Sequence, residues 1–199
     1  DGAEIIISME NMSKFDRIEY ELTYLADNPQ IVGDKITRGA TGTDVNTKDP
    51  KYKKSILLGT ASRGVRSPDT GIADGKLTMH MFVAEEEFLS ETEWTLEKIG
   101  ISPVTISDKS ANFQLAVPTL GKNYWVIIAD TVGVPPNPPA FEVADVILPV
   151  YGTFSIAPTF KVAGTLFIKV SAETANLKLY LFNHQDGIWQ KVNSTYNSA

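Results

Sequence analysis

The chain has 199 residues, of which 43% are hydrophobic and 21% are charged, with a net charge of −6 and no cysteine. Such a length and composition are typical of one folded domain and argue against disorder. The lack of cysteine excludes disulfides, thiolate metal sites and a cysteine nucleophile. The acidic balance argues against nucleic-acid binding. Because no apolar run reaches about 18 residues, we expect no membrane-spanning helix.

The chain opens with a β-prone apolar segment, in which Ile5, Ile7 and Met9 share one face of a strand. A terminal strand can pair within its own sheet or add to the open edge of a neighbouring molecule. The second alternative makes segment 1–12 a candidate donor strand, whose three apolar side chains dock into another copy.

Period-two alternation of apolar and polar residues recurs along the chain and predicts half-buried strands over 17–25, 76–83, 111–117 and 177–182. The runs 124–129 and 165–170 are apolar on both faces, which predicts central strands. Further strands are expected over 54–58 and 143–150. Asp74-Gly75 predicts a turn, and Asp186-Gly187 predicts the turn of a C-terminal hairpin.

The segment 84–99 is the one candidate helix. Ser90 followed by Glu93 fits a capping box and Gly100 fits a helix stop, so a short helix is predicted over 84–89 or 90–98. As an alternative, Trp94, Leu96 and Ile99 also fit a strand that Gly100 closes poorly. Loops are expected over 33–51 and 59–75, which are rich in residues that favour turns.

A proline-rich run, 134–139, is expected to be extended because paired prolines favour polyproline II. It could divide two domains, but a long crossover between two sheets of one sandwich fits better. We therefore predict an all-β chain: a single jelly-roll-like antiparallel β-sandwich domain over 1–199, with at most one or two short helices.

Catalytic machinery is not evident, and we predict that the protein is not an enzyme. The two histidines, His80 and His184, are far apart in sequence, and no G-x-S-x-G elbow or phosphate-binding loop is present. Zinc requires His or Cys clusters that the chain lacks. The glutamates at 85–87 and at 91, 93 and 97 are typical of a solvated face.

Calcium is the best metal hypothesis because hard cations take oxygen ligands from loops. Asp44 and Asp49 lie in one Asp- and Asn-bearing loop, and Asp69 and Asp74 lie in a second. The alternative is that these residues form turns through bonds from side chain to backbone.

Two sequons, at Asn11 and Asn193, predict possible glycans. A carbohydrate-binding or adhesion module is an alternative function, and it would need exposed aromatic residues on one face, with Tyr52, Trp189 and Tyr196 as candidates. A virion structural protein is a second alternative.

The segments 4–9 (Glu-Ile-Ile-Ile-Ser-Met) and 14–25 (Lys-Phe-Asp-Arg-Ile-Glu-Tyr-Glu-Leu-Thr-Tyr-Leu), with the Asp-bearing loops, suggest a family. In these features the acidic, cysteine-free chain resembles the cannula-forming secreted proteins of hyperthermophilic archaea, which are similar to camelysin-type jelly-roll filament proteins. The resemblance implies an extracellular structural subunit that forms tubes or filaments. It also implies donor-strand complementation between copies and calcium at the contacts.

Overall fold

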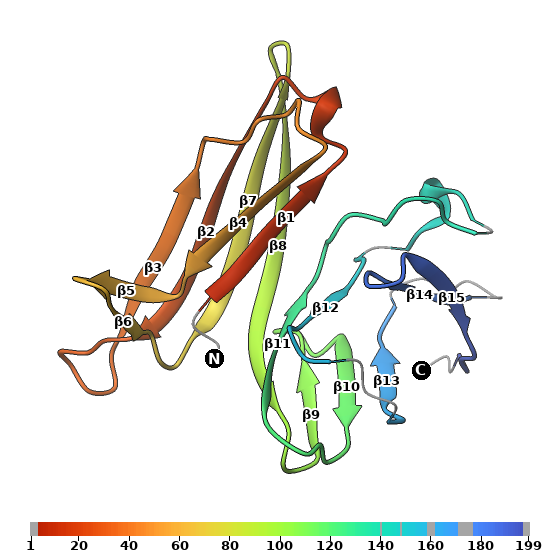
Figure 1. Cartoon of the computed structure of the whole chain (residues 1–199). Coiled ribbons are helices and arrows are strands. Elements are labelled where there is room, and N and C mark those ends of the chain that lie inside the picture. Colours follow the sequence, from red (N-terminus) through yellow and green to blue (C-terminus); the bar gives the residue numbers. More distant parts are fainter. Residues whose placement is uncertain (1–3, 140, 148, 159–161, 171–176, 197–199) are drawn as a thin grey trace.

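A computed structural model describes residues 4–139, 141–147, 149–158, 162–170 and 177–196 (Figure 1). The described residues form antiparallel sheets and two short 3-10 turns, so the all-β prediction is confirmed. In chain order the elements are β1 (Glu4–Glu10), η1 (Met12–Lys14), β2 (Arg17–Asp27), β3 (Lys35–Gly42), β4 (Lys51–Leu57), β5 (Gly59–Ser62), β6 (Val65–Pro68), β7 (Ala73–Val83), β8 (Glu86–Ile99), β9 (Val104–Ser107), β10 (Phe113–Val117), β11 (Tyr124–Ala129), η2 (Val143–Asp145), β12 (Gly152–Phe154), β13 (Thr165–Ile168), β14 (Leu179–Asn183) and β15 (Ile188–Val192).

A six-stranded sheet in the order β12-β11-β8-β7-β2-β3 forms the centre of the fold. Its longest strand is β8, whose 14 residues have two partners. Residues 86–94 of β8 pair with β7, and residues 94–99 pair with β11. Trp94 lies where the two pairings meet, opposite both Gly75 and Ala129. One strand thus joins the two halves of the molecule.

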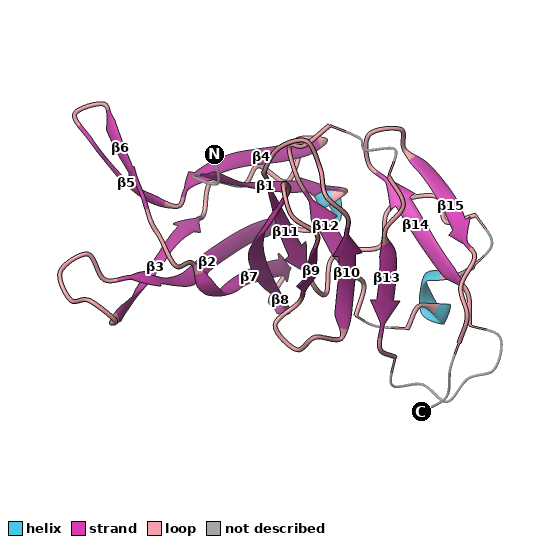
Figure 2. Ribbon diagram, turned by 90° about the horizontal axis from the view of Figure 1, so that it is seen from below, coloured by secondary structure: helices cyan, strands magenta, loops and turns pink. Residues whose placement is uncertain are grey.

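Two smaller sheets cover opposite faces of this sheet. The β1–β4 pair lies over β2 and β7 (Figure 2), where Ile5 shares a core with Leu22 and Trp94. The three-stranded sheet β13-β10-β9 packs on Ile128, whose neighbours include Ile106 of β9. Because Trp94 and Thr95 point to opposite faces of β8 and Ile128 is paired with Thr95, the two cores lie on opposite sides of the sheet.

The alternation predicted for residues 17–25 is confirmed in β2, which buries Ile18, Tyr20, Leu22 and Tyr24 and leaves the intervening residues more exposed. The C-terminal hairpin is also confirmed. Gly187, between β14 and β15, has a φ of +65° and its N–H donates to the Asn183 carbonyl at 2.8 Å. Glycine adopts this left-handed conformation at no steric cost.

The short helix predicted over 84–89 or 90–98 is wrong, because residues 86–99 form strand β8. The turn that precedes it carries no Gly or Asn signal: Ala84 has a φ of +52°, and its N–H donates to Asp16 Oδ2 at 2.7 Å. Positive φ is uncommon for alanine, and the Asp16 contact stabilises it here. Nine paired positions with β7 outweigh the local capping pattern.

Two strand predictions, one turn prediction and parts of both loop predictions are also corrected. Residues 143–150 hold η2 and no strand in their described part, and β13 is an edge strand with Phe167 56% exposed rather than a central one. Asp74-Gly75 lies inside β7, where Asp74 has a φ of +49° beside an irregularity in the pairing with β2. Strands β3, β5 and β6 occupy parts of the regions expected to be loops.

The proline-rich run connects β11 to β12, which are neighbours in one sheet. It therefore leaves and returns to the same sheet, and the expected crossover between two sheets is wrong. Asn137 has a φ of +55°, so the run is bent rather than extended throughout.

Gly75 tests the packing at the β8 junction. A Cβ added there would lie 2.3 Å from Cδ2 and Cε2 of Trp94, which is itself 4% exposed. We expect Gly75→Ala to lower the free energy of unfolding by about 1–3 kcal/mol, as overpacked cores do. Urea denaturation measures this. Gly121→Ala is the control, because its Cβ would meet nothing within 4 Å, and an equal loss in both variants would contradict the packing described.

Candidate assembly site

The N-terminal strand lies in its own chain. β1 pairs antiparallel with β4, with register from Glu4 opposite Leu57 to Glu10 opposite Lys51. Ile5, Ile7 and Met9, the expected docking residues, are 8%, 5% and 8% exposed. Of the two alternatives for a terminal strand, the structure shows pairing within the subunit, so the place beside β4 is already filled.

The three docking residues enter two neighbouring clusters on the same face of the six-stranded sheet. Ile5 packs in the cluster that contains Leu22, Leu58 and Trp94. Ile7 and Met9 pack with Met12, Ile18 and Tyr20. The β1 strand thus covers the inner face of β2 with apolar side chains, and its removal would expose both clusters to water.

A single 3-10 turn connects β1 to β2. Asn11, before η1, has a φ of +58°, a conformation that asparagine tolerates better than most residues. Met12 is 2% exposed, and the Phe15 N–H donates to the Met12 carbonyl at 2.9 Å. The chain therefore passes from the small sheet to the large one within a few residues.

Polar contacts fasten both ends of β1. Glu10 forms an ion pair with Lys51 at 2.7 Å. Glu4 accepts a hydrogen bond from Ser55 Oγ at 2.5 Å and pairs with Arg66 of β6. The Ser55 hydrogen bond, followed by the Arg66 contact, holds the pKa of Glu4 below its ordinary value of 4.5. Ionised Glu4 therefore favours the docked strand.

The four aspartates predicted to bind calcium are not brought together. Asp44 accepts from Tyr52 OH at 3.0 Å and from Lys54 Nζ at 3.1 Å. Asp69 accepts from Tyr24 OH at 2.8 Å. In the described residues, no group of three or more His, Cys or acidic side chains could hold a metal.

The other two aspartates also have local roles. Asp74 pairs with Lys109 at 2.7 Å, and the Asp49 N–H closes a turn on the Asn46 carbonyl at 3.1 Å. Carboxylates that are paired with cations or hydroxyls do not supply the converging oxygens that calcium needs. The four aspartates therefore do not form a converging donor set in the described residues. In the 44–49 loop, the Lys48 N–H donates to Asn46 Oδ1 at 3.2 Å, which is a side-chain to backbone bond of the kind that the alternative predicted.

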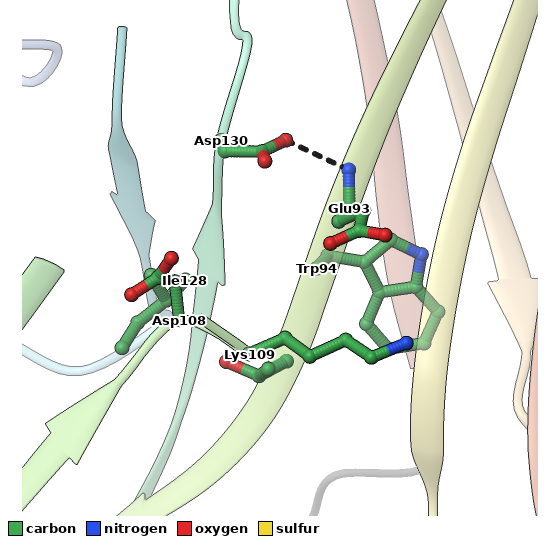
Figure 3. A pocket seen from close by; sticks show the side chains of 7 residues that line it. Glu93, Trp94, Asp108, Lys109, Ile128 and Asp130 are labelled. Carbon is green, nitrogen blue, oxygen red and sulfur yellow. Dashed lines mark hydrogen bonds between the residues drawn. The ribbon is translucent and has the colours of Figure 1, made fainter. Parts of the chain in front are cut away.

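A shallow hollow lies where β8 changes partner, and its lining includes Glu93, Asp108 and Asp130 (Figure 3). Two of its carboxylates accept backbone hydrogen bonds: Asp130 Oδ1 from the Glu93 N–H at 2.8 Å and Asp108 Oδ1 from the Phe113 N–H at 2.7 Å. These bonds hold the loops after β9 and β11 in place, so these two carboxylates stabilise the fold.

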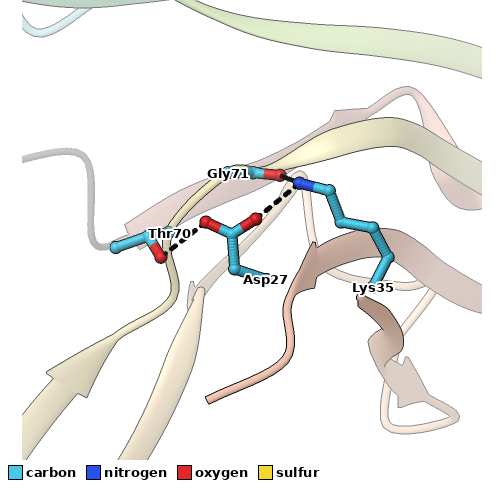
Figure 4. Close-up of polar contacts among 4 residues, drawn as sticks. All are labelled: Asp27, Lys35, Thr70 and Gly71. Atoms are coloured by element: carbon cyan, nitrogen blue, oxygen red, sulfur yellow. Dashed lines mark hydrogen bonds and ion pairs between the residues drawn. The ribbon is translucent and has the colours of Figure 1, made fainter. Parts of the chain in front are cut away.

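A second polar cluster joins the β2–β3 turn to the segment before β7 (Figure 4). Lys35 Nζ lies 2.7 Å from both Asp27 Oδ1 and the Gly71 carbonyl, and Thr70 Oγ1 donates to Asp27 Oδ2 at 2.9 Å. The Lys35 hydrogen bond, followed by that of Thr70, lowers the pKa of Asp27. Sequence reasoning missed this cluster because Asp27 and Lys35 become cross-strand partners only once β3 is recognised.

The histidines and the aromatic residues considered as candidate site residues are spread over separate parts of the molecule. His80 Nδ1 lies 2.5 Å from Glu87 Oε1 on the β7–β8 hairpin, and the His184 ring contacts Phe154 and Phe182. Of the aromatic residues considered for sugar binding, Tyr52 forms a hydrogen bond with Tyr20 beside the β1–β4 pair. Trp189 donates a hydrogen bond to the Pro136 carbonyl in another part of the molecule.

Tyr196 is 47% exposed, and both sequon residues, Asn11 and Asn193, lie at the surface. Glycosylation stays a prediction.

Comparison with protein-family models, with curated proteins and with solved structures found no match. In the part of the chain that the structure describes, no helix has the length and apolar character required to cross a bilayer.

The Glu4 contact predicts a pH dependence. A carboxyl whose folded pKa is lowered contributes stability above its unfolded pKa and loses it as the pH falls through the folded pKa. We expect Glu4→Gln to be less stable than the native chain at pH 7, and the difference to vanish as the pH falls well below 4.5. Urea denaturation across this range measures it. Ser8→Ala, on the same exposed face of β1, is the control, and a difference that persists in acid would contradict the assignment.

Proposed function

We propose that the chain is a non-catalytic structural subunit that assembles with copies of itself by exchanging β1. The observation that carries the proposal is the pairing of β1: its strand partner is β4, in a two-stranded sheet that is separate from the six-stranded sheet. In the exchanged form, β1 of one copy pairs with β4 of the next. Because β1 of each copy already occupies the place beside its own β4, β1 must leave this place before it can pair with β4 of another copy.

Exchange preserves the contacts of the closed subunit. The register with β4, the burial of Ile5, Ile7 and Met9, and the Glu4 contacts are the same whether β1 comes from the same chain or from another. The free energies of the closed subunit and the exchanged assembly then differ through the conformation of the hinge at Asn11–Phe15 and through the entropy of association. Head-to-tail exchange forms a ring if the rotation closes and an open filament if it does not.

The magnitudes allow β1 to detach without the whole fold. Burial of each apolar side chain contributes roughly 1.5–3 kcal/mol. Ordering each strand residue costs roughly 1–2 kcal/mol, and β1 orders seven residues to bury three such side chains. The strand hydrogen bonds to β4 add roughly 0.5–1.5 kcal/mol each, so the net stabilisation of the docked strand is modest. We therefore expect β1 to open more readily than the six-stranded sheet.

The assignment as a structural subunit, rather than an enzyme, is supported by the roles of the polar side chains. Asp108 and Asp130 hold backbone amides, His80 pairs with Glu87, and His184 packs on aromatic rings. The extracellular location and the tube or filament form are part of the proposal through the family resemblance. Calcium is not part of it, because the aspartates do not converge.

Cysteine pairs test the exchange directly, because the native chain has no cysteine. Ser8 and Lys53 are opposite each other and both are exposed. Cross-strand partners lie within the Cα separation that a disulfide accepts. When Ser8→Cys and Lys53→Cys chains are mixed under assembly conditions and oxidised, we expect a mixed dimer on non-reducing gels. Ser8→Cys mixed with Lys35→Cys is the control, since Lys35 lies on β3.

The double variant Ser8→Cys/Lys53→Cys tests whether assembly stops when β1 is bonded covalently to β4 of its own chain. Its oxidised form holds β1 in cis, and we expect it to remain monomeric in sedimentation velocity, whereas the reduced form assembles as the native chain does. Assembly of the oxidised, intramolecularly bonded monomer would rule out exchange of β1.

A further inference from the structure

The proline-rich run contacts the C-terminal hairpin through a specific hydrogen bond. Trp189 Nε1, on β15, donates to the carbonyl oxygen of Pro136 at 3.0 Å. An indole N–H is a donor only, and a proline residue has a carbonyl but no N–H of its own. The donor-only indole is therefore paired with a residue whose backbone can only accept a hydrogen bond.

The hairpin presents three aromatic residues on one face. Tyr180 and Phe182 are two residues apart on β14, and Trp189 is the cross-strand partner of Phe182. The Phe182 and Trp189 rings lie 5.2 Å apart. Alternation along β14 and the pairing with β15 place all three side chains on the same side.

The proline-rich segment supplies its own aromatic anchor. Phe141, just beyond the run, has its ring 5.1 Å from that of Tyr180 and 5.5 Å from that of Trp189, edge-on to the latter. The segment thus reaches the hairpin face at two points, the Pro136 carbonyl and the Phe141 ring. Both points come from one short stretch of sequence.

The proline-rich run 134–139 is conformationally restricted. The proline rings fix φ at four of six positions in 134–139. Asn137, at a φ of +55°, bends the run between its two proline pairs. A segment with so little freedom loses little entropy on docking, which is why aromatic surfaces bind proline-rich peptides effectively.

We propose that the aromatic face of Tyr180, Phe182 and Trp189 is a recognition site for a proline-rich peptide that carries an aromatic anchor, and that residues 134–139 of the same chain, with Phe141, are its occupant in the monomer. A peptide of the same sequence, supplied in trans, competes for this face. The site lies apart from β1, and the proposal does not depend on strand exchange.

The test uses a labelled synthetic peptide with the sequence of residues 133–142, titrated by fluorescence anisotropy into the full chain and into its Phe141→Ala variant. A tethered occupant acts at an effective concentration in the millimolar range. We therefore expect binding to the variant to be at least about tenfold tighter than to the native chain, because loss of its own anchor weakens the competitor.

Two controls define specificity. A peptide with serine in place of its prolines should not bind, and Trp189→Phe, added to Phe141→Ala, should weaken binding several-fold because the ring stays and the donor is lost. Absence of peptide binding to the Phe141→Ala variant, or equal binding when Trp189 is replaced by alanine, would overturn the proposal.

A measurement on the native chain covers the case in which the Phe141→Ala variant does not fold. The indole proton of Trp189, identified in NMR spectra by its loss in Trp189→Phe, should exchange with solvent more slowly than that of free tryptophan. Excess peptide should shift this resonance. An unprotected indole proton that the peptide leaves unmoved would refute the site.

Discussion

The two pairings of β8 are the constraint on which the rest of the structure depends. Its first part pairs with β7 and its last part with β11, and Trp94 lies at the change of partner. This makes one continuous sheet of six strands, with the β1–β4 pair on one face and the β13-β10-β9 sheet on the other. Both cores are built on β8: Trp94 belongs to the first, and Ile99 to the second.

The role of β1 follows from this arrangement. Ile5 of β1 belongs to the same core cluster as Leu22 and Tyr24, yet the hydrogen-bonded partner of β1 is β4 and not a strand of the central sheet. The central sheet is therefore continuous without β1. A strand that completes a core from a separate two-stranded sheet, and that is joined to β2 by a short turn at Asn11, is suited to exchange between copies, whereas β8 is not.

Sequence reasoning succeeded where side-chain periodicity reports burial directly. The alternation of Ile18, Tyr20, Leu22 and Tyr24 predicted β2, and Asp186-Gly187 predicted the last hairpin. It failed at β8, because the turn at Ala84 is held by Asp16, which is distant in sequence. The docking face of β1 was predictable from Ile5, Ile7 and Met9, but its partner was not, since a one-chain pattern does not distinguish β4 of the same copy from that of another.

Native-state hydrogen exchange followed by NMR tests most directly whether β1 is a separable element. Amides open locally with free energies up to that of global unfolding, and the ranking reveals which segments detach on their own. We expect the β1 amides that are hydrogen-bonded to β4 to have a lower opening free energy than the amides of β8 and β2. Equal protection of β1 and β8, with both opening only on global unfolding, would contradict it.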